Sequence, residues 1–169
     1  MILVLLGTQD KPFTRLLQMV DEAVDKGVIK EEVIAQVGFT KYKSKNIKTF
    51  DLIPRDEMDK LIGKANLIIT HGGVGFITDS IKHNKKIIAV PRLQKYGEHT
   101  NDHQIQIIGE FAKLGYLIPM NENDTISSVL ERIKIFKPNK YKKNNKIMNI
   151  IEEYIENNSK EKHKNGKEK

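Results

Sequence analysis

Short apolar runs that alternate with helix-patterned segments constrain the fold of this chain most strongly. The clearest runs lie at residues 2–6, 33–37, 67–70 and 87–90, with weaker ones at 47–52 and 116–118. A strand that is continuously apolar is buried on both faces, which is typical of parallel strands covered by helices. The alternation therefore predicts an α/β fold: a Rossmann-like, doubly wound parallel sheet of about six strands with helices on both faces.

Prolines and small polar residues mark the expected starts of the intervening helices. Pro12 precedes a first periodic segment, and Pro54 opens a short second one. A further helix is expected over residues 77–83. Thr100 and Asp124 are the expected N-caps of the last two helices of the sheet domain, because such side chains accept hydrogen bonds from free helix N–H groups.

The chain divides into three parts by composition. Residues 1–136 carry the strand and helix patterns and are expected to form one domain. Residues 137–158 are expected to form an amphipathic helix, whose apolar stripe consists of Ile147, Ile150, Ile151, Tyr154 and Ile155. Residues 159–169 have almost no apolar side chains, so we expect a disordered basic tail.

The distribution of charge argues against a nucleic-acid partner. The net charge is +7, but residues 137–169 hold ten lysines and five glutamates. The remainder has a net charge of only +2, with both signs interleaved. A basic end is usually solvated, and less often it contacts acidic lipid or a partner protein.

Cysteine content and hydropathy exclude several classes of protein. The sequence has no cysteine, so it has neither a disulfide framework nor a thiolate metal site. The apolar start at residues 1–6 is too short for a signal peptide, and no apolar run approaches the roughly 20 residues that a bilayer requires. We therefore expect a soluble protein. No D-x-D pattern occurs. His99 and His103 have the H-x-x-x-H spacing, but His99 precedes the helix expected after Thr100, so the two do not share a helix face and no metal site is expected.

A glycine-rich stretch, "THGGVGF" at residues 70–76, connects a strand-like run to a helix-like segment. Ligands of open parallel sheets bind at the carboxyl ends of strands, and a helix N-terminus favours an anion such as phosphate. Gly72, Gly73 and Gly75 would let a phosphate approach the backbone closely, with His71 beside it. The alternative is a tight turn that needs positive φ angles and binds nothing. Three glycines in four positions favour the ligand.

The common phosphate-binding motifs do not fit this stretch. A Walker loop requires Gly-Lys followed by Ser or Thr, which is absent. The dinucleotide fingerprint G-x-G-x-x-G matches at Gly73 and Gly75, but its third position is Thr78. That fingerprint also follows the first strand of its domain, whereas this loop follows about the fourth.

Two more polar loops are expected at the same edge of the sheet. Gly7, Thr8 and Gln9 follow the first strand, and "GEHTNDHQ" at residues 97–104 follows the strand that ends near Pro91. Together the three loops offer a phosphate site and a polar cluster able to bond several hydroxyl groups. That combination indicates a nucleotide linked to a sugar.

These stretches, in this order and spacing, resemble a known family. "VLLGTQDKPFTRLL", "MDKLIGKANLIITHGG" and "ITHGGVGFITDSIKHNKKIIAVPRLQKYGEHTNDHQIQI" are similar to the C-terminal, donor-binding half of family 28 glycosyltransferases. The resemblance covers about residues 1–135 and is closest to short, one-domain members. Those members are the cytosolic subunits of two-component UDP-sugar transferases, in dolichol-linked GlcNAc transfer and in bacterial exopolysaccharide and capsule synthesis.

The resemblance implies one half of a GT-B fold with a UDP-sugar as the donor substrate and no other cofactor. It implies that Gly7, Thr8 and Gln9 lie near the nucleotide. His71, with Gly72, Gly73 and Gly75, would face the diphosphate. Asp79, where the family usually has Glu, would accept hydrogen bonds from the ribose.

For the sugar, the resemblance points to the third loop. His103 and Gln104 match residues that contact the donor sugar, and Asp102 precedes them in the same polar loop. Phe76 departs from the family, which often has Ser or Thr at this position to bind phosphate. Backbone N–H groups would then carry more of the phosphate binding. By residue type alone, Asp79 would be a solvated helix residue.

A two-domain GT-B enzyme places its acceptor site and its general base on the other half. The resemblance therefore implies a membrane-anchored partner subunit that binds a lipid-linked acceptor and supplies the base. This chain would work at the inner face of the membrane, in the cytoplasm. One alternative is a regulatory or enhancer subunit that has lost donor binding. Another is half of a sugar-nucleotide epimerase, which would need carboxylates from a second domain.

Overall fold

The sheet has six parallel strands, as the alternation of apolar runs predicted. The computed structural model describes residues 1–143, 146–147, 149–154 and 156. The strands are β1 (Ile2–Leu5), β2 (Val33–Gln36), β3 (Ile47–Phe50), β4 (Leu67–His71), β5 (Lys86–Val90) and β6 (Ile118–Pro119). Their spatial order is β3-β2-β1-β4-β5-β6, and every pair of neighbours is parallel. This is the order of a doubly wound nucleotide-binding sheet.

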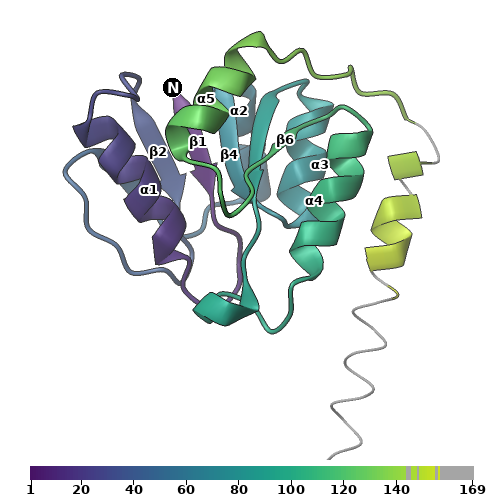
Figure 1. The fold of residues 1–169 in the computed structure, drawn as a ribbon, viewed down its shortest axis with the longest axis horizontal. Helices are drawn as coiled ribbons and strands as arrows, with labels where there is room; N and C mark the ends of the chain where they lie inside the picture. The colour runs from purple at the N-terminus through teal and green to yellow at the C-terminus, as the bar shows by residue number, and fades with distance from the viewer. Residues whose placement is uncertain (144–145, 148, 155, 157–169) are drawn as a thin grey trace, which may run out of the picture.

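Helices cover both faces of the sheet (Figure 1). One face is covered by α1 (Thr14–Asp25) and α5 (Ile126–Ile135). The other face is covered by α2 (Arg55–Lys64), α3 (Val74–Lys82) and α4 (His103–Lys113). A short 3-10 helix, η1 (Gln94–Tyr96), lies in the loop after β5.

The continuous apolar runs are explained by these two layers. In β1, Ile2 and Val4 pack with the side chains of α1 and α5, whereas Leu3 and Leu5 pack with those of α2, α3 and α4. All four side chains are at most 3% exposed. Alternate residues of a strand point to opposite faces, so a strand between two helical layers needs apolar residues at every position.

The chain reverses its winding direction between β1 and β4, and this switch point positions the site. Leu5 at the end of β1 is in register with Gln36 of β2 and with Thr70 of β4. The loops that leave these three strands therefore begin side by side. Such a crevice is where open α/β sheets bind their ligands.

Three of the expected helix starts are wrong. Helix α3 begins at Val74, whereas the helix was expected from residue 77. Helix α4 begins at His103 rather than just after Thr100, because the loop continues to Asp102. Helix α5 is capped by Thr125, whose hydroxyl accepts from the Ser128 N–H while the Ser128 hydroxyl accepts from the Thr125 N–H. Several polar residues precede α4 and α5, and the local sequence does not distinguish which of them caps.

The described part of the C-terminal segment packs on the sheet domain. Ile147 is 4% exposed and belongs to the apolar cluster beneath α3 and α4, and Ile150 and Tyr154 pack against the same cluster. Ile155 and the expected disordered tail at residues 159–169 lie outside the described residues. Within the described part of the chain, no helix is long and apolar enough to cross a bilayer.

Candidate functional site

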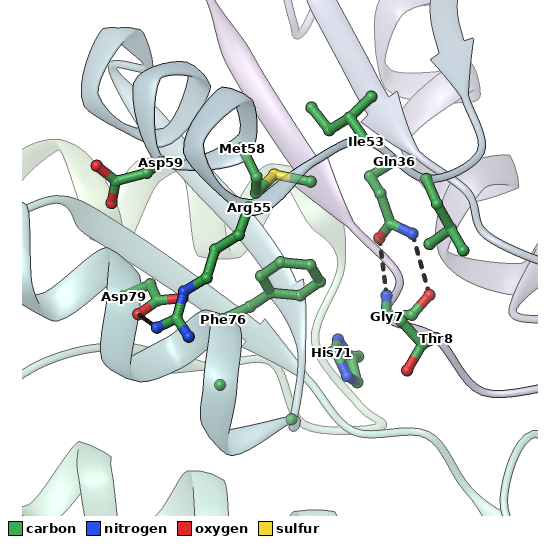
Figure 2. A pocket seen from close by; sticks show the side chains of 13 residues that line it. Gly7, Thr8, Gln36, Ile53, Arg55, Met58, Asp59, His71, Phe76 and Asp79 are labelled. Carbon is green, nitrogen blue, oxygen red and sulfur yellow. Dashed lines mark hydrogen bonds and ion pairs between the residues drawn. The ribbon is translucent and has the colours of Figure 1, made fainter.

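A cavity of about 370 Å³ opens at the switch point (Figure 2). Its walls come from the loop after β1, the end of β2, the loop after β3, the first turns of α2, and the junction of β4 with α3. The lining residues are Gly7, Thr8, Gln36, Leu52, Ile53, Arg55, Met58, Asp59, His71, Gly73, Gly75, Phe76 and Asp79. Six of the expected site residues are therefore brought together: Gly7, Thr8, His71, Gly73, Gly75 and Asp79.

The loop after β1 is held by a buried glutamine that sequence reasoning missed. The Gly7 N–H donates to Gln36 Oε1 at 3.0 Å, and Gln36 Nε2 donates to the Gly7 carbonyl at 3.1 Å (Figure 2). Gln36 also donates to the Asp51 carbonyl and is fully buried. Gly7 adopts a φ of +84°, which favours glycine. The side chain of Gln36 thus fixes the first loop relative to β2 and β3.

His71 ends β4, and its ring lies between Gly7 and Gly73 in space. A Cβ atom on Gly7 would lie 2.5 Å from His71 Nε2, and a Cβ on Gly73 would overlap the same ring. Gly73 has a φ of −77°, and among the described glycines neither Gly72 nor Gly75 has a positive φ. The positive φ angles of the simple-turn interpretation are therefore absent. Gly73 is needed because only a bare Cα leaves room for the imidazole.

Burial keeps His71 uncharged. The side chain is 7% exposed, and this desolvation, with the positive charge of Arg92, lowers the pKa of His71 to about 3. Its Nδ1 lies 3.3 Å from the Leu5 carbonyl oxygen, which can only accept a hydrogen bond. In that tautomer Nδ1 carries the proton, and Nε2 offers a lone pair on the side of Gly7 and Gly73.

The N-terminus of α3 provides uncapped N–H groups at the cavity. Gly73 is its N-cap, and no side chain of the described residues caps the helix. The Gly72 N–H is already used, because it donates to Gln104 Oε1 at 2.9 Å. The free N–H groups of the first helical turn, which includes the cavity residues Gly75 and Phe76, remain for an anion. Apart from the adjacent residues and the backbone of α3 itself, no atom of the described residues lies within 4 Å of the position of a Cβ on Gly75, so this glycine opens onto free space.

Asp79 and Phe76 extend from α3 into the same cavity. The Asp79 carboxylate is 26% exposed and lies 3.9 Å from both Arg55 and Lys82, so its oxygens remain available for other donors. The Phe76 ring contacts the His71 ring edge-on, with centroids 6.0 Å apart. Phe76 therefore contributes an apolar surface where a hydroxyl group was expected.

The opposite wall is apolar and was not predicted. Leu52 and Ile53 follow β3, and Met58 lies in the first turns of α2. Ile53, Met58 and Phe76 lie around the same space (Figure 2), and with Leu52 they form a surface suited to a flat ring. In the sequence these residues look like ordinary core positions. The position of Leu52 and Ile53 in the sequence could have identified them, because they directly follow a third parallel strand whose carboxyl end lies at the same edge of the sheet.

The third loop does not line the cavity as expected, and neither does Gln9 of the first loop. Gln9 faces His99 of the third loop, with 3.2 Å between their Nε2 atoms, and Asp102 accepts from the Gln94 N–H at 2.8 Å. His103 lines a separate small hollow between α4 and the C-terminal segment, with Ile150 and Tyr154. Gln104 is 3% exposed and faces Gly72. The expected cluster of sugar-binding side chains is therefore divided between several positions around the cavity.

Buried charges tie the third loop to the first. The Arg92 side chain is fully buried and donates to the Leu6 and Lys11 carbonyls. Glu98, 3% exposed, accepts two hydrogen bonds from Arg15 at 2.8 and 2.9 Å and one from the Leu93 N–H. In the sequence Glu98 is one polar residue of a loop, but in the structure it connects α1, through Arg15, to the loop after β5, through Leu93.

The described residues contain no group of three or more His, Asp or Glu side chains placed to hold a metal ion. The cavity lining offers free N–H groups, one neutral imidazole, the carboxylates of Asp59 and Asp79, the Arg55 guanidinium and an apolar wall. This combination suits an anionic ligand that carries both a flat ring and hydroxyl groups.

The similarity of the sequence to known proteins identifies the family. Residues 1–167 match the Glycosyltransferase family 28 C-terminal domain. The chain belongs to this family.

Relatives of this family 28 domain include larger enzymes and subunits. It is 32% identical over 114 residues to a UDP-N-acetylglucosamine–N-acetylmuramyl-(pentapeptide) pyrophosphoryl-undecaprenol N-acetylglucosamine transferase of Prochlorococcus marinus, covering 65% of this chain and 30% of the relative. It is 28% identical over 97 residues to the UDP-N-acetylglucosamine transferase subunit ALG13 of Candida glabrata, covering 56% of this chain and 44% of the relative. The chain thus spans less than half the length of either relative.

Solved structures confirm the fold. The solution structure of ALG13 superposes with a TM-score of 0.53 and 20% identity, covering 81% of this chain and 87% of that one. The crystal structure of MurG from Acinetobacter baumannii superposes with a TM-score of 0.52 and 18% identity, covering 78% of this chain and 39% of that one. The family 28 domain therefore has the architecture of one half of a GT-B glycosyltransferase, as the sequence predicted.

Proposed function

We propose that this chain is the donor-binding catalytic subunit of a two-component inverting glycosyltransferase. It binds a UDP-sugar, and the sugar is transferred to a lipid-linked acceptor that a membrane-anchored partner subunit holds. The observation that carries the proposal is the cavity at the switch point, with an uncapped helix N-terminus on one side and an apolar wall on the other. Membership of family 28 supports the same activity.

The cavity suggests one orientation for the nucleotide. The base lies against Leu52, Ile53 and Met58, because a flat ring buries apolar surface there. The diphosphate lies at the N-terminus of α3, where the helix dipole and the free N–H groups favour negative charge. The ribose between them comes within reach of the Asp79 carboxylate. The sugar then points out of the cavity, past Thr8 and Gln9, toward the acceptor.

The chain's own contribution to the reaction is to stabilise the leaving group. In an inverting transfer the acceptor oxygen attacks the anomeric carbon, the bond from that carbon to the diphosphate oxygen breaks, and UDP departs with the electron pair. N–H groups at the α3 terminus are aimed where this negative charge develops. A phosphate beside the neutral His71 favours protonation of the imidazole, and the protonated ring can donate a hydrogen bond to the phosphate. The acceptor proton passes to a base that we assign to the partner subunit.

A partner protein follows from the division of labour in this fold. The resemblance is to a donor-binding half, and the ALG13 relatives are described as subunits of a transferase. We place the chain in the cytoplasm, peripherally at the inner face of the membrane, through that partner. The sequence resemblance to bacterial exopolysaccharide and capsule proteins supports a role in polysaccharide synthesis there.

Calorimetry with UDP tests the proposal first. We expect the purified chain to bind UDP more tightly than ADP or inorganic pyrophosphate, because the apolar wall and Asp79 add to the phosphate contacts. With a co-purified membrane partner and a lipid-linked acceptor, UDP-sugar should be consumed. The chain alone should transfer little or no sugar.

Two results would contradict parts of this proposal. Full turnover by the isolated chain would exclude the division between two subunits. Failure to bind any nucleotide, in a chain that folds and still binds the partner, would favour a regulatory subunit. The replacement of a hydroxyl residue by Phe76 is the observation that favours this second candidate.

A further inference from the structure

One side-chain oxygen joins two loops of the site. Gln104 Oε1 accepts hydrogen bonds from the Gly72 N–H at 2.9 Å and from the Arg92 N–H at 3.0 Å. The side chain is 3% exposed, and a Cβ on Gly72 would lie only 2.6 Å from Gln104 Cβ. Gln104 is therefore packed directly against the turn after β4, and its carbonyl oxygen is occupied within the protein.

The side chain of Arg92 continues this connection to the third segment. Its Nη2 donates to the Leu6 carbonyl at 2.6 Å, and its Nη1 donates to the Lys11 carbonyl at 2.7 Å and to the Glu98 carbonyl at 3.2 Å. Leu6 directly precedes the cavity residue Gly7. The backbone of residue 92 is thus bonded to Gln104, and its side chain is bonded to the loop after β1.

Stability alone does not explain an arginine at this position. The guanidinium is fully buried and bonds to carbonyl oxygens, while the Glu98 carboxylate is bonded to Arg15. Within the described part of the chain, Arg92 Nε has no hydrogen-bond partner. Burying a charged guanidinium that has one unpaired nitrogen and no carboxylate bonded to it among the described residues is unfavourable compared with packing an apolar side chain of similar volume. What the arginine provides, and an apolar residue cannot, is a set of directed bonds to two loops.

We propose that Arg92 and Gln104 are positioning residues that together form a latch between the loops after β1, β4 and β5, and so hold the N–H groups at the α3 terminus in the arrangement that binds a donor diphosphate. This inference rests on the proposed donor-binding function. It replaces the expectation that Gln104 acts chiefly by touching the donor sugar. The latch acts on the diphosphate site, which every nucleotide ligand shares.

The two roles predict different patterns of binding. If Gln104 contacted only the sugar, its loss would weaken UDP-sugar binding and leave UDP binding unchanged. If Gln104 belongs to the latch, its loss frees the Gly72 and Arg92 N–H groups and loosens the turn that follows β4. UDP and UDP-sugar should then lose affinity by the same factor.

The test compares Gln104→Met with a matched control in the core. Methionine fills similar space but offers no strong acceptor. Val129→Ala is the control, because Val129 is fully buried in α5 on the other face of the sheet and does not line the cavity. Affinities for UDP and UDP-N-acetylglucosamine are measured by calorimetry well below both melting temperatures, and amide hydrogen exchange is followed by NMR.

We expect Gln104→Met to lower the affinities for UDP and for UDP-N-acetylglucosamine at least tenfold, with the ratio of the two affinities unchanged. Val129→Ala should bind both ligands as the wild type does. The amides of Gly72 and Arg92 should lose protection together, while the Gly7 amide, which is bonded to Gln36, keeps it. Arg92→Lys retains the charge but can reach fewer of the carbonyls, so it should give a smaller common loss. Arg92→Lys also provides the test of the latch if Gln104→Met does not fold.

Three outcomes would overturn the latch or its basis. Unchanged UDP affinity with weaker UDP-N-acetylglucosamine binding would make Gln104 a sugar contact. Unchanged affinity for both ligands would restrict the pair to a structural role. If the wild-type chain binds no UDP, the proposed function fails first, and the role of the latch in donor binding fails with it.

Discussion

The two walls of the cavity differ in how firmly the protein holds them. On the wall formed by the loops after β1 and β4, Gly7 is bonded twice to Gln36, and His71 is 7% exposed. On the wall formed by the loop after β3 and by α2, Leu52 is 56% exposed and the Arg55 side chain is 88% exposed. The polar wall is held by internal hydrogen bonds, whereas the apolar wall combines a packed side chain, Met58 at 7% exposed, with a solvent-exposed one, Leu52.

This difference matches what each wall would bind. Hydrogen bonds to a phosphate depend on direction, so the donors must be preorganised before the ligand arrives. Contact with a flat base depends mainly on buried area, and side chains can adjust on binding. Substitutions on the polar wall should therefore have large effects and substitutions on the apolar wall small ones.

The largest effect is expected from Gly73→Ala. The new methyl group would overlap the His71 ring, so the ring or the turn must move. Such overpacking typically lowers the free energy of unfolding by about 1–3 kcal/mol. UDP binding should become undetectable in calorimetry, because the α3 N–H groups move with the turn. Chemical denaturation and calorimetry measure the two effects.

The double variant His71→Ala, Gly73→Ala provides the control for this clash. Removing the imidazole makes room for the methyl group, so the double variant should regain stability compared with Gly73→Ala alone. A single variant with wild-type stability and wild-type UDP affinity would show that the polar wall is not rigid.

The next effect is the acid sensitivity of the polar wall. The pKa of His71 is lowered to about 3 in the folded chain by burial and by Arg92, compared with about 6.5 when unfolded. Between these values the unfolded state binds the extra proton, so stability is complete above about pH 6.5 and falls as the pH falls. The expected loss from this group is about 2 kcal/mol at pH 5.

Urea denaturation at pH 7.5 and pH 5 measures this loss, with His71→Asn as the comparison. Asparagine keeps a donor for the Leu5 carbonyl but does not titrate, so its stability should change less between the two pH values. Bound UDP should reduce the wild-type loss, because a phosphate beside His71 favours the protonated ring. An identical pH dependence in both chains would mean that His71 is not held neutral.

A smaller, cleaner effect is expected from Gly75→Ala, with Gly109→Ala as its matched control. Both glycines lie in helices, and for neither does a described atom outside its own helix backbone and adjacent residues lie within 4 Å of the added Cβ. Either substitution should leave stability unchanged or raise it by up to about 1 kcal/mol. Only Gly75 lines the cavity, so only Gly75→Ala should weaken UDP binding, by about tenfold or roughly 1.4 kcal/mol. Equal affinities in the two variants would place the phosphate elsewhere.

The fold was predictable because its main signal is local. Each strand is apolar at successive positions, as in residues 2–6, because both faces of the sheet are covered. The order of the strands follows from the rules for doubly wound sheets. The helix starts at Thr100 and Asp124 were wrong because capping depends on which of several polar side chains reaches the free N–H groups.

The site was predictable only where the sequence shows it directly. The glycines of the turn after β4 were identified, but the reason for two of them was not. Gly72 makes room for Gln104, which lies 32 residues away, and Gly73 makes room for the His71 ring. Such contacts depend on the tertiary structure. Leu52 and Met58 were missed because an apolar residue that lines a cavity looks the same in sequence as one in the core.

The smallest effect is expected from Leu52→Ala on the apolar wall. Leu52 is already 56% exposed, so truncation should change the stability little. A bound base would cover part of that exposed surface, and its loss should weaken UDP binding by roughly 0.5–1 kcal/mol, or about two- to fivefold. Binding of inorganic pyrophosphate should not change, because it does not reach this wall. Ile135→Ala is the control, since Ile135 is 85% exposed and lies outside the cavity. A tenfold or greater loss in Leu52→Ala alone would show that this wall is as firmly organised as the polar one, and that the contrast between the two walls is wrong.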